Sequence, residues 1–442
     1  DKDEEEEEEE EDLAIKPTDK LLLAARSEEE VCNIQVHVYE EDSHNLYPHH
    51  DILLPSFPLA MEWLGQRPVS TSGASGGGAN LLAVGTFEPQ IEIWDLDVLN
   101  TFSPVAMLGG EYTEPIAPDA GGGKGKKGKK KKKKNTSAER EGGAPDPAKG
   151  HTDAVMALAW NRLQPNALAS ASADRTVRVW DLGAPGLPTV QTLSHHGDKV
   201  QAVRWHPSEA SVLLTGSFDH TAAVLDVRAP GSHRSFTVDA DVEGAVWGSD
   251  THVLVSSEDG HVACFDVRAE GRVWALSAHH KAATGLTCNP AVAGVFATCS
   301  TDKTVKVWSS AAGTPQLVCA KEMNLGALFD VAFCGDAPHL LAAGGSTGKV
   351  GVWDASESTA VCEVLGIPHA STPAGGSIAM SGMQAVDVHT SDSEDDDDDD
   401  ETPRAPGPAA GAAAGAGSGA AKAKSKGKVA VKKGGSKAGA RR

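Results

Sequence analysis

The stretch ALASASADRTVRVWD at residues 167–181 returns in four varied copies further along this chain of 442 residues. Each copy has a turn residue six positions before a large apolar side chain, and these side chains follow Trp180 at intervals of 45, 40, 43 and 45 residues. They are Leu225, Phe265, Trp308 and Trp353. Self-similarity at such a fixed period indicates a repeat architecture in which each copy is one supersecondary unit.

The pattern within a copy is that of β-strands. Residues 176–180 combine β-branched and aromatic side chains with a charged one, as a half-buried strand does. A second aromatic series lies 18 to 20 positions ahead of the first and marks a leading strand: Trp160, Trp205, Trp247 and Phe333. Helical periodicity is nearly absent. The period and the Trp-Asp ending therefore predict an all-β fold, a WD-repeat β-propeller with four-stranded blades.

Two further units lie upstream of these copies. In one, residues 81–87 lead to the strand at 91–95, and Trp63 takes the place of the leading aromatic residue. In the other, residues 21–25, 34–39 and 46–54 predict three strands, with Tyr39 in the tryptophan position. The count is therefore seven blades, of which the first has no obvious leading strand. Closure of the ring requires that strand from another source, because an open propeller leaves an exposed sheet edge.

The formal net charge of −22 is segregated along the chain. Eleven of the first twelve residues are carboxylates, and a second acidic block covers residues 392–401. Nine lysines fall between residues 124 and 134, and the segment 422–442 is basic. Blocks of like charge repel themselves and remain solvated. We therefore expect a disordered acidic tail at 1–15, a propeller at 16–366 with a disordered lysine-rich insertion at about 110–149, and a disordered acidic then basic tail at 367–442.

The seven cysteines form no CxxC pair and are odd in number, which indicates a reducing compartment rather than a disulfide framework. No apolar stretch is long enough to span a bilayer, and the acidic start is the reverse of a signal peptide. We expect no membrane partner.

A polar network recurs in three of the units. A histidine lies 23 residues before the turn aspartate, and a serine or threonine lies four residues before it. Where the histidine is absent, the hydroxyl is replaced by Val255 or Ala343. Groups that occur only together indicate a buried hydrogen-bond network. The predicted structural sets are His151–Ser170–Asp174–Trp180, His196–Thr215–Asp219, which lacks the indole, and His279–Thr298–Asp302–Trp308.

A hydrolase could also use serine, histidine and aspartate, but a nucleophilic site occurs once in a chain and no strained elbow surrounds these serines. The pairs His49-His50, His195-His196 and His279-His280 could suggest a metal, yet no cysteine or carboxylate lies at ligand spacing. The tryptophans could form a cage for a methylated lysine, although nothing in their spacing selects them for it. We expect no enzyme activity, catalytic residue, metal, cofactor or small-molecule substrate.

Three features are candidates for interaction or regulation. Phe218, just before a turn aspartate, is a candidate partner-binding residue, although inward packing is an equal alternative. Ser391 and Ser393 precede acidic residues and are candidate phosphosites. The lysine-rich insertion is a candidate nuclear-localisation signal or RNA contact, against the alternative of a merely solvated loop. Its lysines are Lys124, Lys126, Lys127, Lys129, Lys130, Lys131, Lys132, Lys133 and Lys134.

Several more specific motifs resemble those of one family of WD-repeat proteins, the periodic tryptophan protein 1 family. They are KPTD (16–19), HHDILLP (49–55), IEIWDLD (91–97), GHTDAV (150–155), LASASAD (168–174), HPSE (206–209) and VDADVE (238–243). The resemblance covers residues 16 to about 365, and the lysine-rich insertion after the MLGG of residues 107–110 also looks like that family's. The basic end from residue 409 and the Gly/Ser loop at 70–79 depart from it.

The resemblance implies a nuclear and nucleolar factor of large-subunit ribosome assembly and pre-rRNA processing. Its expected partners are ribosome-assembly proteins and pre-ribosomal particles, with pre-rRNA contacted through the basic segments. The family also has links to chromatin at ribosomal genes, so a histone-tail binding module is the alternative. The family supplies no catalytic residues to carry over to this chain.

Overall fold

A computed structural model of the chain describes residues 19–28, 31–41, 43–65, 80–98, 101–110, 148–369 and 383–385. The acidic tail predicted at 1–15 lies outside the described residues. So do almost all of the lysine-rich insertion and most of the tail predicted at 367–442.

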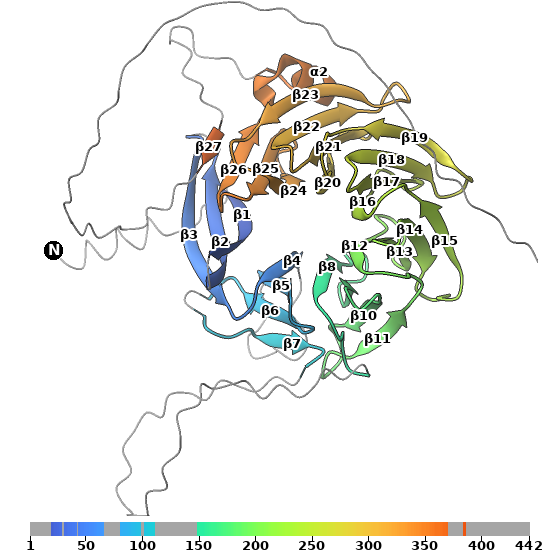
Figure 1. The fold of residues 1–442 in the computed structure, drawn as a ribbon. Coiled ribbons are helices and arrows are strands. Elements are labelled where there is room, and N and C mark those ends of the chain that lie inside the picture. Colours follow the sequence, from blue (N-terminus) through green and yellow to red (C-terminus); the bar gives the residue numbers. More distant parts are fainter. Residues whose placement is uncertain are drawn as a thin grey trace, which may run out of the picture. The chain divides into compact units, whose positions relative to one another are not determined.

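The described strands form seven antiparallel sheets, each one blade (Figure 1). Blade 1 consists of β1 (Lys20–Glu28), β2 (Val31–Glu40) and β3 (Asn45–Leu54). Blade 2 consists of β4 (Pro58–Leu64), β5 (Leu81–Thr86), β6 (Ile91–Asp95) and β7 (Ala106–Leu108). Blade 3 consists of β8 (Val155–Trp160), β9 (Ala167–Ser172), β10 (Val177–Asp181) and β11 (Thr189–Leu193). Blade 4 consists of β12 (Val200–Trp205), β13 (Val212–Ser217), β14 (Thr221–Asp226) and β15 (His233–Thr237).

Blade 5 consists of β16 (Val242–Trp247), β17 (His252–Ser257), β18 (His261–Asp266) and β19 (Arg272–Ser277). Blade 6 consists of β20 (Gly285–Cys288), β21 (Val295–Cys299), β22 (Thr304–Ser309) and β23 (Gln316–Glu322). Blade 7 consists of β24 (Leu328–Phe333), β25 (Leu340–Gly345), β26 (Val350–Asp354) and β27 (Met383–Ala385). The prediction of an all-β, seven-bladed WD-repeat propeller is confirmed.

The hydrophobic core lies between neighbouring blades rather than within one sheet. In Figure 1 the first strand of each blade from β4 to β24 faces the centre, and the later strands lie progressively outward. The second strands are buried on both faces, as β5 shows with no exposed residue. Ile91 and Ile93 of blade 2 pack with Leu158 and Trp180 of blade 3 in one such cluster. Each sheet thus buries its apolar side chains against the next one.

Small residues allow these sheets to approach closely. A β-carbon on Gly85 of β5 would lie 2.7 Å from Val155 Cγ1, at the start of the next blade's inner strand. At the equivalent position of blade 4, a β-carbon on Gly216 would lie 2.6 Å from Val242 Cγ1. Both glycines are therefore required by contact between blades and not by backbone conformation.

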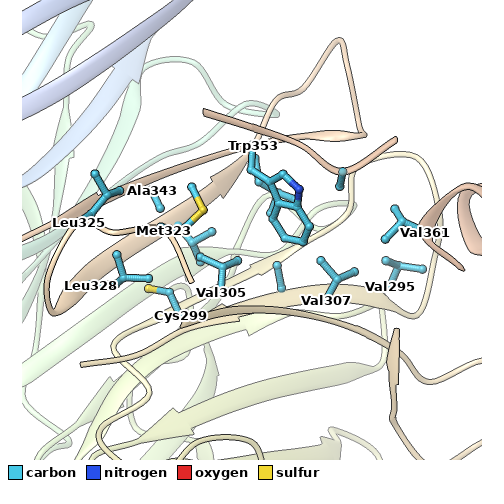
Figure 2. Packing of buried hydrophobic residues seen from close by; sticks show 14 residues of the cluster. Val295, Cys299, Val305, Val307, Met323, Leu325, Leu328, Ala343, Trp353 and Val361 are labelled. Atoms are coloured by element: carbon cyan, nitrogen blue, oxygen red, sulfur yellow. The ribbon is translucent and has the colours of Figure 1, made fainter. Parts of the chain in front are cut away.

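The last blade ends differently from the others. After β26 the chain forms a 3₁₀ turn, η2 (Ala355–Glu357), and a short helix, α2 (Thr359–Leu365), which ends at Gly366 in the left-handed conformation, with φ of 67°. Val361 of α2 packs in a cluster with Trp353, Val295 and Val307 (Figure 2). Residues 383–385, inside the range predicted as tail, then pair with β26 as the outer strand. A Met-Gln-Ala tripeptide is too short to show a strand period in the sequence.

Two simpler features accompany this fold. None of the seven cysteines, all of which are described, is disulfide-bonded. In the described part of the chain, no helix has the length and apolar character needed to cross a bilayer.

The close contacts between blades predict the effect of a larger side chain at position 216. Gly216→Val should lower the free energy of unfolding by roughly 1–3 kcal/mol, because its side chain overlaps Val242 in a packed interface. Urea denaturation measures this change. The matched control is Gly335→Val, since no atom lies within 4 Å of a β-carbon at Gly335. Equal stability of the two variants would contradict the packing described here.

Candidate functional site

The predicted polar network of blade 3 is present and joins four elements. His151, in the loop before β8, places Nδ1 2.9 Å from Asp174 Oδ2 and Nε2 2.7 Å from Ser170 Oγ. Trp180 of β10 donates its indole N–H to the same Ser170 oxygen, at 2.8 Å. Asp174 lies in the turn between β9 and β10, so the network ties a loop, a turn and two strands together.

The aspartate also fixes the turn that carries it. Asp174 Oδ1 accepts hydrogen bonds from the Thr176 backbone N–H at 2.9 Å and from its hydroxyl at 2.6 Å. The residue between them, Arg175, has a left-handed backbone with φ of 68°. That conformation raises the free energy of a residue with a β-carbon. It is kept only where the surrounding interactions hold the backbone in place. In blade 5, which lacks the histidine, the corresponding residue is Gly260 with φ of 83°.

The hydrogen-bonding groups determine which atoms of this network carry the protons. The Trp180 indole nitrogen only donates, so the Ser170 oxygen accepts from it, and the Asp174 carboxylate only accepts, so His151 carries a proton at Nδ1. In the neutral ring Nε2 then accepts a hydrogen bond from the Ser170 hydroxyl. Burial lowers the pKa of His151, which favours this neutral form. Although burial alone would raise it, hydrogen bonds from His151 and Thr176 hold the pKa of Asp174 well below its ordinary range.

Blade 6 repeats this arrangement with a threonine in place of the serine. His279 Nδ1 lies 2.9 Å from Asp302 Oδ2, and its Nε2 lies 2.8 Å from Thr298 Oγ1. Trp308 donates to Thr298 Oγ1 at 3.0 Å. Lys303, after the aspartate, is again left-handed, with φ of 76°.

Blade 4 completes its network with a residue that the sequence reading missed. His196 contacts Asp219 at 3.0 Å and Thr215 at 2.8 Å, as predicted. Leu225 occupies the tryptophan position and has no donor, but His195 Nε2 lies 3.0 Å from Thr215 Oγ1 and contacts the hydroxyl in place of the indole. Burial, together with His196, lowers the pKa of His195 to about 3, so the ring is neutral. The adjacent pair His195-His196 was visible in the sequence, but only His196 was predicted to belong to the network.

The three hydroxyls have no catalytic geometry. Ser170, Thr215 and Thr298 are each 0% exposed. Each already lies within hydrogen-bond distance of two ring nitrogens, so none is available to attack a substrate. The arrangement holds loops to strands in three blades.

The candidate metal ligands do not converge. Among the described residues, no group of three or more histidine, cysteine, aspartate or glutamate side chains could hold a metal ion. His49 and His50 contact each other through their Nδ1 atoms at 2.7 Å. His280 is exposed while His279 belongs to the blade 6 network.

Two of the leading tryptophans donate hydrogen bonds to the preceding blade, while Trp160 donates to the Pro165 carbonyl of its own blade. Trp205 donates its indole N–H to the Ala159 carbonyl of the preceding blade at 3.0 Å. Trp247 does the same to the Arg204 carbonyl at 3.4 Å. These side chains belong to the contacts that hold consecutive inner strands together.

Phe218, the candidate partner-binding residue, is half-buried in the turn between β13 and β14. Its role stays a prediction. Phe87 occupies the same turn position in blade 2 and is 58% exposed, and its ring centroid lies 5.3 Å from that of Phe57. The sequence contained the signal, because Phe87 precedes the position six residues before Trp94.

The remaining candidates are outside the part of the chain that the structure describes. They are the lysines of the insertion, from Lys124 to Lys134, and the serines Ser391 and Ser393.

The repeated blades and their shared networks define a WD-repeat propeller, a class of proteins whose rigid blades present loops for protein docking. The family model described as WD domain, G-beta repeat matches residues 148–181, 187–226 and 271–309, which fall in blades 3, 4, 5 and 6.

Comparison with curated proteins gives a more specific family. Over 367 residues the chain is 42% identical to a Schizosaccharomyces pombe protein described as an uncharacterized WD repeat-containing protein, covering 82% of this chain and 66% of that one. It is 32% identical over 374 residues to the Drosophila melanogaster periodic tryptophan protein 1 homolog, covering 83% and 74%. It is 30% identical over 386 residues to Saccharomyces cerevisiae periodic tryptophan protein 1, covering 78% and 64%. The chain belongs to the periodic tryptophan protein 1 family, and it spans about two thirds of the length of its two yeast relatives.

Removing the central hydroxyl of a network should destabilise the propeller. Ser170→Ala leaves the Trp180 N–H and His151 Nε2 buried without a partner, at a cost of roughly 1–3 kcal/mol for each group. Chemical denaturation checks the loss. Ser170→Thr is the matched control, because it restores the hydroxyl that blades 4 and 6 use. An alanine variant as stable as the unaltered protein would show that the network does not stabilise the fold.

The lowered histidine pKa values also predict how stability depends on pH. Because the pKa values of buried His151, His196 and His279 are lower folded than unfolded, their stabilising effect is complete above about pH 6.5 and declines as pH falls below it. The lowered pKa values of Asp174, Asp219 and Asp302 add a further loss below about pH 4.

Urea unfolding measured across this range tests the dependence. The variant His280→Gln, which alters an exposed neighbour and keeps all three buried histidines, should retain the loss of stability below about pH 6.5. A free energy of unfolding that stays constant from about pH 8 to pH 5 would contradict the neutral, buried state of the three histidines.

Proposed function

We propose that the protein is a non-enzymatic scaffold of ribosome biogenesis that acts on precursors of the large subunit in the nucleus and nucleolus and supports pre-rRNA processing. Membership of the periodic tryptophan protein 1 family supports this role. That family is associated with ribosome biogenesis, and it supplies no catalytic residues to carry over to this chain.

The observation that carries the scaffold assignment is the structural role of the three repeated Ser/Thr, His and Asp sets. All three lie in buried networks that bind loops to strands, and their hydroxyls are inaccessible. The groups that remain exposed on the turns are of a kind that binds other macromolecules. Phe57 and Phe87, 44% and 58% exposed, form such an aromatic pair on blade 2.

The basic segments give the scaffold a means to contact pre-rRNA. Nine lysines without interleaved aromatic residues would bind phosphates without reading bases. The described residues on either side of the insertion lie together, since a β-carbon on Gly150 would be 2.6 Å from Gly109 Cα. Blades 2 and 3 therefore stay in contact whatever the length of the insertion that connects them. Part of the insertion can be removed without straining the propeller.

Sedimentation of nuclear extracts tests the proposal. The protein should co-migrate with large pre-ribosomal particles, and it should remain with them after nuclease treatment that releases chromatin. Co-fractionation with nucleosomes, and absence from those particles, would support the chromatin alternative and contradict the scaffold role.

A deletion of residues 121–134 in the same experiment tests the lysine-rich insertion. We expect unchanged thermal unfolding together with weaker nuclear retention or weaker salt-sensitive RNA binding. The matched control replaces the nine lysines with glutamine and keeps the length. Unchanged retention and RNA binding in both variants would make the insertion a solvated loop, while particle association would still decide the scaffold role separately.

A further inference from the structure

The loop that leads into the inner strand of blade 4 has a histidine that its counterparts lack. His195 comes directly before the network histidine His196. The corresponding residues are Gly150 in blade 3 and Ala278 in blade 6, and neither side chain can titrate. Blade 4 therefore places a second ionisable ring beside its central hydroxyl, since His195 Nε2 lies 3.0 Å from Thr215 Oγ1.

A third histidine comes from the outer strand of the same blade. His233 of β15 has the cross-strand position that Thr189 holds in blade 3 and Leu317 holds in blade 6. The centroid of its ring lies 5.2 Å from that of His195, and the centroids of His195 and His196 are 4.3 Å apart. The three rings form one cluster, and blades 3 and 6 have no such cluster among their described residues.

Among the described residues, one carboxylate faces this cluster. Asp219 Oδ2 lies 3.0 Å from His196 Nδ1 and accepts a hydrogen bond from the Gly197 backbone N–H at 2.8 Å. The charged groups that act on His195 are His196 from the loop, His233 from β15 and Asp219 from the turn between β13 and β14. A proton on His195 therefore adds a charge beside two other histidines, while the carboxylate is already engaged.

The surroundings of His195 also offer no acceptor for a second ring proton. Its Nδ1 is buried and has no hydrogen-bond partner among the described residues. The protonated ring would have an N–H at that atom, and a buried N–H without an acceptor is unfavourable. A histidine in water, by contrast, binds a proton with a pKa of about 6.5. Protons therefore favour an open form of this blade over the closed one.

Blade 4 is also less completely filled beside this cluster. Leu225 replaces the tryptophan that blades 3 and 6 have at this position, so the network of blade 4 has no indole. Leu225 and His233 line a hollow of about 390 Å³ that is open to solvent, together with Val212 and Ala229. His233 is itself exposed. The cluster therefore has solvent on one side, and an opening of this blade alone lets water reach the buried rings.

We propose that blade 4 is a proton-operated switch of the propeller. When His195 and His196 take up protons, the loop before β12 and the turn between β13 and β14 separate from Thr215, and blade 4 opens more often than blades 3 and 6. Phe218 belongs to this turn, and its backbone N–H donates to the Lys199 carbonyl of the loop at 3.0 Å. The opening breaks this bond as well and exposes the half-buried ring of Phe218.

Proton linkage gives the size of the expected effect. A histidine that is neutral in the closed blade and charged in the open one raises the opening constant up to about tenfold for each pH unit below about 6.5. Burial lowers the pKa of both His195 and His196 in blade 4, whereas blade 6 has one such ring, His279. The opening constant of blade 4 should therefore rise up to about a hundredfold for each pH unit.

Hydrogen exchange of the full chain tests the proposal, with rates corrected for the intrinsic pH dependence of amide exchange. From about pH 6 to about pH 5 the protection of amides in β14 should fall roughly sixtyfold, and the protection of amides in β22 of blade 6 should fall roughly eightfold. The strand β22 is the internal control, because it has the same place in a blade with one network histidine. Parallel losses of protection in the two strands would overturn the proposal.

The variant His195→Gln removes one titrating ring from the cluster. Glutamine can still form a hydrogen bond with Thr215 but takes up no proton, so the pH dependence of β14 should drop to about that of β22. The matched control is His280→Gln, which removes an exposed histidine beside the network of blade 6 and should leave both profiles as they are. Thermal unfolding at about pH 7.5 checks that both variants fold. A β14 profile that stays steep in folded His195→Gln would overturn the proposal.

A double variant tests the same point if the single one does not fold. Leu225→Trp combined with His195→Ala gives blade 4 the residue types that blade 6 has at Trp308 and Ala278. An indole then replaces the histidine ring beside Thr215, so the β14 amides should lose protection only as steeply as those of β22. A steep β14 profile in this variant would overturn the proposal. None of these measurements depends on association with pre-ribosomal particles.

Discussion

One buried hydroxyl in each of three blades is the point on which the local structure of that blade depends. Ser170 and Thr298 each accept a hydrogen bond from a tryptophan indole, and Thr215 lies 3.0 Å from His195 Nε2. All three hydroxyls contact a histidine that is held by the turn aspartate. In blades 3 and 6 the direction of donation is fixed at both ends, because an indole can only donate and a carboxylate can only accept. The network therefore holds the sheet, the turn and the loop of a blade in one arrangement. That fixed arrangement sets the surface that each blade packs against its neighbour.

The comparison of blades shows how far this network governs the backbone. Where it is present, the residue after the aspartate is left-handed although it is not glycine, as at Arg175, His220 and Lys303. Where the histidine is missing, glycine takes that position at Gly260 and Gly348. The network thus replaces the conformational freedom of glycine with hydrogen bonds that hold a costly conformation.

Features with a fixed spacing could be predicted from the sequence, while those that depend on spatial neighbours could not. The period of the tryptophans gave the blades, and the joint occurrence of His151 and Ser170 gave the network, because both lie at constant positions in each repeat. The role of His195 could not be predicted, because its ring reaches Thr215 from a loop and not from the strand position that Leu225 occupies. The short strand β27 has too few residues to show any period.

These features describe a rigid frame that rests on the hydrogen-bond networks of three blades. NMR of the chain labelled with ¹⁵N in its histidine rings tests those networks most directly. At about pH 7 and again at about pH 5.5, His151, His196 and His279 should give the shifts of neutral rings protonated at Nδ1, with Nε2 as acceptor. Rings protonated at Nε2, or rings that titrate between these two pH values as free histidine does, would contradict the account.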